Sequence, residues 1–118
     1  MNRLLLLLLA GIAAGLAGCS SRDARTRGGS VQGVVIPVGA IQHSPAGSRV
    51  VVHGVMKQKC PVAGCWFVLN DATGAVKVDT KNAGFVMVDV PLETPITVAG
   101  LVVTNESAFM LDATGVRY

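Results

Sequence analysis

The stretch Arg49–Lys57, which reads Arg-Val-Val-Val-His-Gly-Val-Met-Lys, decides the fold class of this chain. Successive side chains of a β-strand point to opposite faces, so a strand that covers a core carries apolar residues at every second position. This stretch meets that condition and is expected to form a strand. One face would carry Val50, Val52, Gly54 and Met56, and the other Val51, His53, Val55 and Lys57.

The same two-residue period continues towards the C-terminus, between residues that favour turns. After residue 47 no segment has an apolar period of 3.6 residues long enough for a stable helix, so the predicted class is all-β. Upstream, Val34–Pro37 is a short apolar lead-in, and Gly39–Gln42 is expected to form a helical turn. The further expected strands are Cys65–Asn70, Val76–Asp79, Phe85–Val90, Ile96–Val103 and Ala108–Leu111, with the first two joined as a hairpin by Asp71-Ala72-Thr73-Gly74.

Five or six short strands in so small a chain must hide their edges, and a closed barrel does this. A five-stranded OB-type barrel is predicted, with an SH3-like barrel as the alternative. Gly54 and Gly100 fit a barrel, because strongly coiled strands bend where a side chain is missing. Many OB-folds place a helix between their third and fourth strands, whereas this chain offers only Lys81–Gly84 and a short β run. The tetrapeptide Asp-Ala-Thr-Gly recurs at Asp112–Gly115, which predicts a second turn.

The N-terminus has the pattern of a secretory signal peptide. Arg3 precedes an apolar run that is too short for a comfortable membrane span. The run ends in Leu16-Ala17-Gly18-Cys19, which matches the lipobox of bacterial lipoproteins, where a lipid is attached to the Cys before cleavage on its N-terminal side. The sequence therefore predicts a signal peptide at 1–18, lipidation of Cys19 within a flexible tether at 19–33, and one barrel domain at 34–118.

A lipid on Cys19 would hold the mature chain to a membrane on the periplasmic side of the cell envelope. Ser20, rather than Asp, follows Cys19 and favours the outer membrane over the inner one. Of the 10 Lys and Arg residues, four precede residue 30, whereas from Arg49 onward six basic residues face six acidic ones. The barrel is therefore neutral, and a nucleic-acid partner is not expected.

With Cys19 assigned to the lipid, Cys60 and Cys65 remain as a pair in an oxidising compartment. Three uses of this pair stay open. The first is a structural disulfide that closes the short loop between the first two strands. The second is a site for copper or zinc, since soft metals accept thiolate ligands. The third is a redox-active dithiol, although four intervening residues and no following helix distinguish it from the Cys-x-x-Cys pattern.

Met56 and His53 are candidates for additional metal ligands near this pair. They are three positions apart and point to opposite faces of a regular strand, so both could reach one ion only if a bulge intervened near Gly54. Trp66, the only Trp, offers either a stacking surface for a ligand or a packing residue under a loop. The sequence contains no nucleophile-elbow, zinc-protease or phosphate-loop motif, so no enzymatic activity is expected.

The run Val52–Phe67 resembles a family of small bacterial envelope OB-fold domains, which are often lipoproteins. The resemblance rests on the central Gly54, on Cys60-x4-Cys65-Trp66 with Gly64 before the second Cys, and on Gly84-Phe85. It covers roughly residues 34–118, and the Gly-Cys-Trp element is its specific part. It implies an OB-type fold and an envelope location rather than an activity. The chain departs from the family at Pro61-Val62-Ala63, where polar or basic residues are expected, and this departure speaks against anion binding.

These features predict a lipid-anchored, non-enzymatic binding module that uses the Cys60-Cys65-Trp66 loop. Its ligand would be a transition metal or another protein of the envelope. The alternative is a copper- or zinc-binding and delivery protein, or a thiol-redox protein, in which Cys60 and Cys65 change state during function.

Overall fold

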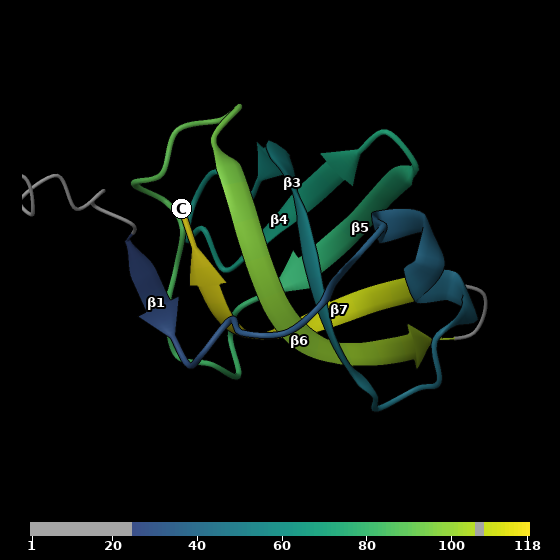
Figure 1. Cartoon of the computed structure of the whole chain (residues 1–118). Coiled ribbons are helices and arrows are strands. Elements are labelled where there is room, and N and C mark those ends of the chain that lie inside the picture. The colour runs from purple at the N-terminus through teal and green to yellow at the C-terminus, as the bar shows by residue number, and fades with distance from the viewer. Residues whose placement is uncertain (1–24, 106–107) are drawn as a thin grey trace, which may run out of the picture.

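Five strands close into a small barrel in the computed structural model, which describes residues 25–105 and 108–118 (Figure 1). The barrel strands pair in the order β3-β4-β5-β7-β6, and β6 returns to pair with β3. Every pair is antiparallel except β5 with β7. The predicted signal peptide and the lipid on Cys19 lie outside the described residues. The strands are β3 (Arg49–Lys59), β4 (Trp66–Asp71), β5 (Gly74–Asp79), β6 (Pro95–Asn105) and β7 (Ala108–Arg117).

The two-residue period of the sequence separates the inside of the barrel from its outside. Val52 and Met56 on β3 are fully buried, whereas His53 between them is exposed. The predicted all-β class and five-stranded OB-type barrel are confirmed, and the SH3-like alternative is not adopted. The other barrel strands contribute fully buried side chains in the same way: Phe67, Leu69, Val78, Ile96, Val98 and Leu111.

Two glycines lie where barrel strands approach each other closely. A Cβ atom added to Gly54 would lie 2.9 Å from the carbonyl carbon of Asn70 and closer still to its oxygen. A Cβ atom added to Gly100 would lie 2.7 Å from the carbonyl oxygen of Asp112. The pairing register shifts two residues beyond Gly54, at Met56, and again at Gly100. The close approach of the neighbouring backbones therefore leaves no room for a side chain at either glycine.

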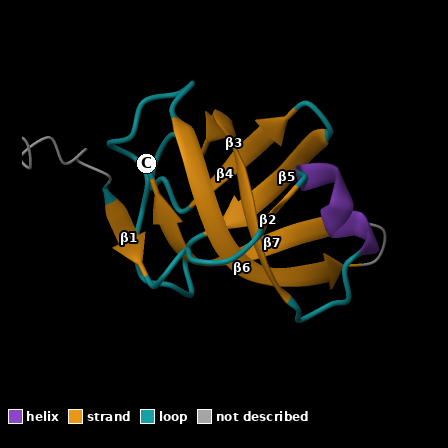
Figure 2. Cartoon of the chain, in the orientation of Figure 1, coloured by secondary structure: helices purple, strands orange, loops and turns teal. Residues whose placement is uncertain are grey.

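Different elements close the two ends of the barrel. The 3-10 helix η2 (Val38–His43) covers one end, at the right in Figures 1 and 2, and inserts Val38 and Ile41 into the core. This helix confirms the expected helical turn. The connection between β5 and β6 covers the opposite end and inserts Met87 and Val90. Within residues 25–105 and 108–118, no helix has the length and apolar character needed to cross a membrane.

The connection between β5 and β6 corrects the prediction of a strand at Phe85–Val90, because this segment is irregular. Its apolar residues alternate since Met87 points into the barrel while Val86 and Val88 are exposed. The backbone, however, bonds to turns rather than to a strand, and the Met87 N–H donates to the Gly64 carbonyl oxygen at 2.8 Å. This irregular plug stands where many OB-folds have a helix.

The folded part also begins before the expected boundary at residue 34. Strand β1 (Thr26–Gly28) pairs with the end of β7, and Arg25 and Tyr118 exchange backbone hydrogen bonds of 2.7 and 2.8 Å. Val31 is buried, and β2 (Val35–Ile36) runs parallel to β3. The prediction of a flexible tether is therefore wrong from Arg25 onward. The polar, Gly-rich composition of this segment gives no apolar period from which β1 could be predicted, because pairing through the backbone needs few apolar side chains.

The second copy of Asp-Ala-Thr-Gly, Asp112–Gly115, corrects another prediction, because it lies inside β7 rather than in a turn. Its Ala113 side chain is buried in the core. The first copy does form the predicted turn between β4 and β5, where the Asp71 carboxylate accepts hydrogen bonds from the backbone N–H groups of Thr73 and Gly74 at 2.7 and 3.1 Å.

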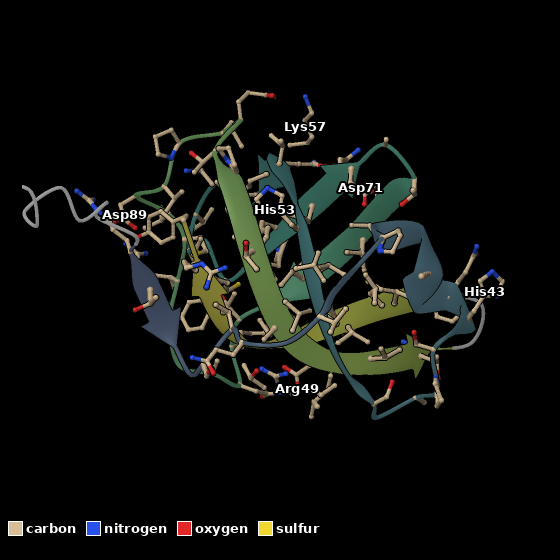
Figure 3. The ribbon with its side chains drawn as sticks, viewed as in Figure 1. His43, Arg49, His53, Lys57, Asp71 and Asp89 are labelled. Carbon is tan, nitrogen blue, oxygen red and sulfur yellow. The ribbon has the colours of Figure 1, made fainter. Side chains whose placement is uncertain are left out.

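An ion pair ties β1 to the connection between β5 and β6. Arg27 Nη2 lies 2.6 Å from Asp89 Oδ2, and Arg27 Nη1 donates to the Val86 carbonyl oxygen at 2.5 Å. The hydrogen bonds from Arg27 lower the pKa of Asp89 to about 2. Figure 3 shows Asp89 at the β1 side of the molecule, far from His43 on η2.

We expect Asp89→Asn to lower the free energy of unfolding at neutral pH only slightly, because the Asp89 side chain is 63% exposed and exposed pairs contribute little. The folded-state pKa lies below the ordinary value of 3.8, so the contribution is present above that value and is lost as the pH falls towards about 2. Urea unfolding of both proteins at several pH values measures it. A difference that stays constant down to the lowest pH would contradict the ion pair.

Candidate thiol site

The loop between β3 and β4 carries both cysteines on a tight, hydrogen-bonded turn. The Cys60 N–H donates to the Trp66 carbonyl oxygen at 3.0 Å, which closes the loop at its base. Within the loop, the Gly64 N–H donates to the Cys60 carbonyl oxygen at 3.2 Å. Pro61 fits this geometry because its fixed φ favours the second position of a turn. The loop lies at the barrel end that the β5–β6 connection covers, since Met87 bonds to Gly64.

This loop carries both thiols, and both are free and partly exposed. Hydrogen bonding from the backbone N–H of Ala63, followed by that of Val62, favours the charged form of Cys60, and smaller contributions come from Gly64 and the Cys65 side chain. Together these hydrogen bonds lower the pKa of Cys60 from 9.0 to about 7, although partial burial acts in the opposite direction. Cys60 is therefore a more acidic thiol than an ordinary cysteine.

Gly64 fixes this turn against the β5–β6 connection. Its φ of +62° is in the left-handed region, and a Cβ atom there would lie 2.7 Å from Val88 Cα and closer still to the Val88 backbone nitrogen. Lys59, next to Cys60, donates from Nζ to the Val88 carbonyl oxygen at 2.9 Å and also to that of Val90. The cysteine loop and the plug are thus held as one unit.

Exposed apolar side chains border the thiols. Val62, at the tip of the loop, is 87% exposed, and Val88 beside Gly64 is 45% exposed. Val86 adds a further exposed apolar surface on the same connection. We call Val62, Val86 and Val88 the apolar rim of the thiol site. Such a rim resembles a contact surface for another chain more than a surface for a charged small molecule.

Trp66 follows Cys65 directly and is half-buried on the outer face of β4. The Lys77 ammonium on β5 lies 5.0 Å from the centroid of the Trp66 ring, in a cation–π arrangement. One face of the indole is therefore occupied by a neighbour of this chain. A ligand that stacked on this face of Trp66 would have to displace Lys77.

The structure does not bring the two additional candidate ligands to the thiols. The Met56 side chain is fully buried in the barrel core, whereas the His53 ring lies on the outer face and bonds through Nδ1 to Thr97 Oγ1 at 2.9 Å. The register shift in β3 falls after Met56 and leaves the two residues on opposite faces. Among the described residues, no group of three or more His, Cys, Asp and Glu residues could hold a metal ion. A metal at this site would therefore rely on Cys60 and Cys65.

A hollow of the surface lies at the other end of the barrel. A pocket of about 160 Å³ is found at the η2 end, lined by residues that include Ile41, Thr73 and Phe109. It contains no cysteine, histidine or charged side chain. We place the candidate site at the loop of Cys60 and Cys65 because it carries two reactive side chains, whereas the lining of this pocket carries none.

The sequence identified both cysteines but missed what surrounds them. The hydrogen bonding that lowers the pKa of Cys60 and the contact of Gly64 with Val88 both depend on the path of the loop. In the sequence, only Pro61 and Gly64 indicate this path. The basic partner of Trp66, Lys77, comes from the paired strand β5.

Comparison with known proteins supports the fold. No protein-family model and no curated protein matches the chain. The hypothetical protein ygiW from E. coli is similar in structure, with a TM-score of 0.57 and 20% identity, over 77% of this chain and 94% of that one. The S. pombe Stn1–Ten1 complex is similar over 71% of this chain and 75% of that one, with a TM-score of 0.52 and 14% identity. At these identities the likeness shows the fold alone: the chain is a small OB-fold protein.

Proposed function

We propose that this protein is a lipid-anchored binding module of the bacterial cell envelope, and that its ligand contacts the thiol site at the end of the barrel. The observation that carries this proposal is the placement of two free, partly exposed cysteines, Cys60 and Cys65, on one hydrogen-bonded turn bordered by the apolar rim. The rim favours another envelope protein as the ligand.

The proposed anchor lies close to the fold. Arg25 already pairs with Tyr118, so only residues 20–24 separate Cys19 from the first described residue. Even a fully extended chain of this length spans at most about 20 Å. A lipid on Cys19 would therefore keep the barrel near the membrane surface.

We expect Cys19→Ser to release the protein from the membrane, because the lipid has no other attachment site. The measurement is fractionation of bacteria that express either protein, together with metabolic labelling by an alkyne fatty acid. The wild-type chain should carry the label and sediment with membranes, and the variant should do neither. A variant that remains labelled, or a wild-type chain that is never labelled, would refute the anchor.

Cu(I) binding is a second candidate function, and the presence of two free thiols on one turn favours it. Soft thiolates select Cu(I), whereas structural zinc sites take four ligands, two more than this site provides. We expect the reduced protein to take one Cu(I) ion from a chromophoric chelator under anaerobic conditions. Cys60→Ser and Cys65→Ser should each abolish uptake, and His53→Ala should leave it unchanged. Uptake that survives loss of either thiol would rule out this site.

A further inference from the structure

We propose that a hollow beside β1 binds an anionic phosphate group through the guanidinium of Arg117. The hollow has a volume of about 360 Å³ and is lined by Arg117 on β7, Thr26 on β1 and the segment Gly28–Gln32. We call it the Arg117 hollow. The inference goes beyond the proposed function, since the lining includes no residue of the thiol site; only the membrane as a source of the phosphate rests on the proposed lipid anchor.

The hollow exists because the chain leaves β1 sharply and then crosses the outside of the barrel. Gly28, with a φ of +74°, turns the chain at the end of β1, and the next residues run across β6 (Figure 1). Val31 fixes this segment, because it is buried in one cluster with Val51 of β3. Arg49 Nη2 also donates to the Ser30 carbonyl oxygen at 3.2 Å. The wall of the hollow is therefore held in place by packing and by a hydrogen bond.

The lining of the Arg117 hollow includes a basic side chain and no acidic one. No ion pair joins Arg117 to another residue in the described part of the chain, whereas Arg27 on β1 is paired with Asp89. A guanidinium presents its N–H donors in one plane and can bond to two oxygens of a phosphate at once. An anion in the hollow would therefore meet the Arg117 guanidinium and no carboxylate of the lining.

Neutral donors accompany the guanidinium. Thr26 is the register partner of Arg117, so their side chains lie on the same face of the sheet. The Ser30 hydroxyl oxygen accepts a hydrogen bond from the Gln32 N–H at 3.2 Å, which leaves its own O–H to donate. The Gln32 side-chain amide offers further N–H donors. A phosphate has more acceptor oxygens than a carboxylate, so this set of donors favours phosphate.

The position of the hollow suits a ligand at a membrane surface. Thr26, Ser30, Gln32 and Arg117 are all exposed, so a phosphate can reach them from solvent. Thr26 also follows Cys19 closely in the sequence, and a lipid on Cys19 would keep the hollow within reach of phospholipid headgroups. The ligand is therefore a phosphate group, carried by a lipid headgroup or by a soluble molecule.

Titration with inorganic phosphate tests the inference on the full-length protein in non-ionic detergent micelles. At constant ionic strength set with chloride, the backbone amide NMR signals of Gly29, Ser30 and Val31 should shift and saturate. Arg117→Gln should weaken this binding at least about tenfold, as expected for loss of hydrogen bonds from a charged group. Lys81→Gln removes the same charge from a 67% exposed side chain outside the hollow, and it should bind phosphate as the wild type does.

Nanodiscs distinguish the two sources of the phosphate. The full-length protein is reconstituted in phosphatidylcholine alone or with added phosphatidic acid, whose headgroup is a phosphate monoester. For a lipid headgroup, phosphatidic acid should reproduce the shifts of Gly29 and Ser30 in the wild type but not in Arg117→Gln. For a soluble ligand, only inorganic phosphate should produce them. Cys19→Ser should still bind inorganic phosphate in micelles, so failure of the anchor would leave the hollow standing.

Three results would overturn the phosphate site. The first is the absence of any saturable shift with inorganic phosphate, and the second is equal binding by Arg117→Gln and the wild type. The third is a set of identical saturable shifts with acetate at the same concentrations, because the donors would then not select phosphate. An equal loss in Lys81→Gln and Arg117→Gln would also contradict the inference, since net charge rather than the hollow would govern binding. None of these results bears on the thiol site of the proposed function.

Discussion

Met87→Ala is expected to lower the free energy of unfolding by about 3 kcal/mol, within the range for truncation of a fully buried Met. Met87 lies in an irregular connection, where a substitution ordinarily has little effect. Its side chain is nevertheless fully buried and closes the barrel end opposite η2. Truncation would leave a cavity between the strands, because the barrel frame cannot collapse onto it. Urea or thermal unfolding followed by the fluorescence of Trp66 measures the loss.

Val86→Ala provides the matched control. Val86 lies one position from Met87 in the same connection, but its side chain is 42% exposed and belongs to the apolar rim. We expect a change of less than about 0.5 kcal/mol, as for most surface substitutions. Equal effects of the two substitutions would mean that the connection does not plug the barrel.

The fold could be predicted where the two-residue apolar period of the sequence reflects which side chains are buried in the barrel. The alternation in Arg49–Lys59 survives in the structure because one face of β3 lies against the core, and Gly54 and Gly100 allow the backbones of neighbouring strands to approach closely. Phe85–Val90 alternates for a different reason, since it folds over the barrel end without pairing. A two-residue period reports which side chains are buried, and it does not report whether the backbone has a neighbour.

The two copies of Asp-Ala-Thr-Gly mark a second limit of local sequence. At Asp71 the carboxylate accepts hydrogen bonds from the backbone N–H groups of Thr73, in the same turn, and of Val38 on η2, and the turn forms. At Asp112 the same tetrapeptide lies within β7: Asp112, Ala113 and Gly115 pair with β6, and the Ala113 side chain is buried in the core. Tertiary contacts decide between two conformations that the tetrapeptide alone permits.

The candidate site was predictable in its reactive atoms and unpredictable in its environment. Cys60 and Cys65 stand out in the sequence, and their short separation indicates that they meet. The acidity of Cys60 could not be predicted, because it comes from backbone N–H groups whose direction depends on the path of the loop. His53 and Met56 appeared as candidate ligands because sequence proximity was taken for spatial proximity, whereas the wall of the barrel separates them.

Gly64→Ala is expected to have the second large effect, with a loss of about 2 to 3 kcal/mol in the free energy of unfolding and a rise in the pKa of the Cys60 thiol. Alanine at φ +62° carries a cost of about 1 kcal/mol by itself. The added Cβ would also overlap the backbone of Val88, which must move because no flexible side-chain end is available to yield. Movement of the loop would turn the N–H groups of Val62 and Ala63 away from the sulfur and remove the hydrogen bonds that stabilise the thiolate.

Gly84→Ala separates the backbone strain from the contact. Gly84 has a similar φ of +79°, but a Cβ atom there would meet nothing within 4 Å. We expect this control to lose only about 1 kcal/mol, the cost of the left-handed conformation, and to leave the labelling midpoint of Cys60 near pH 7. Chemical unfolding and iodoacetamide labelling against pH measure both quantities on each variant. If the two variants lose the same free energy of unfolding and both keep the wild-type labelling midpoint of Cys60, the packing of Gly64 on Val88 does not influence the pKa of the Cys60 thiol.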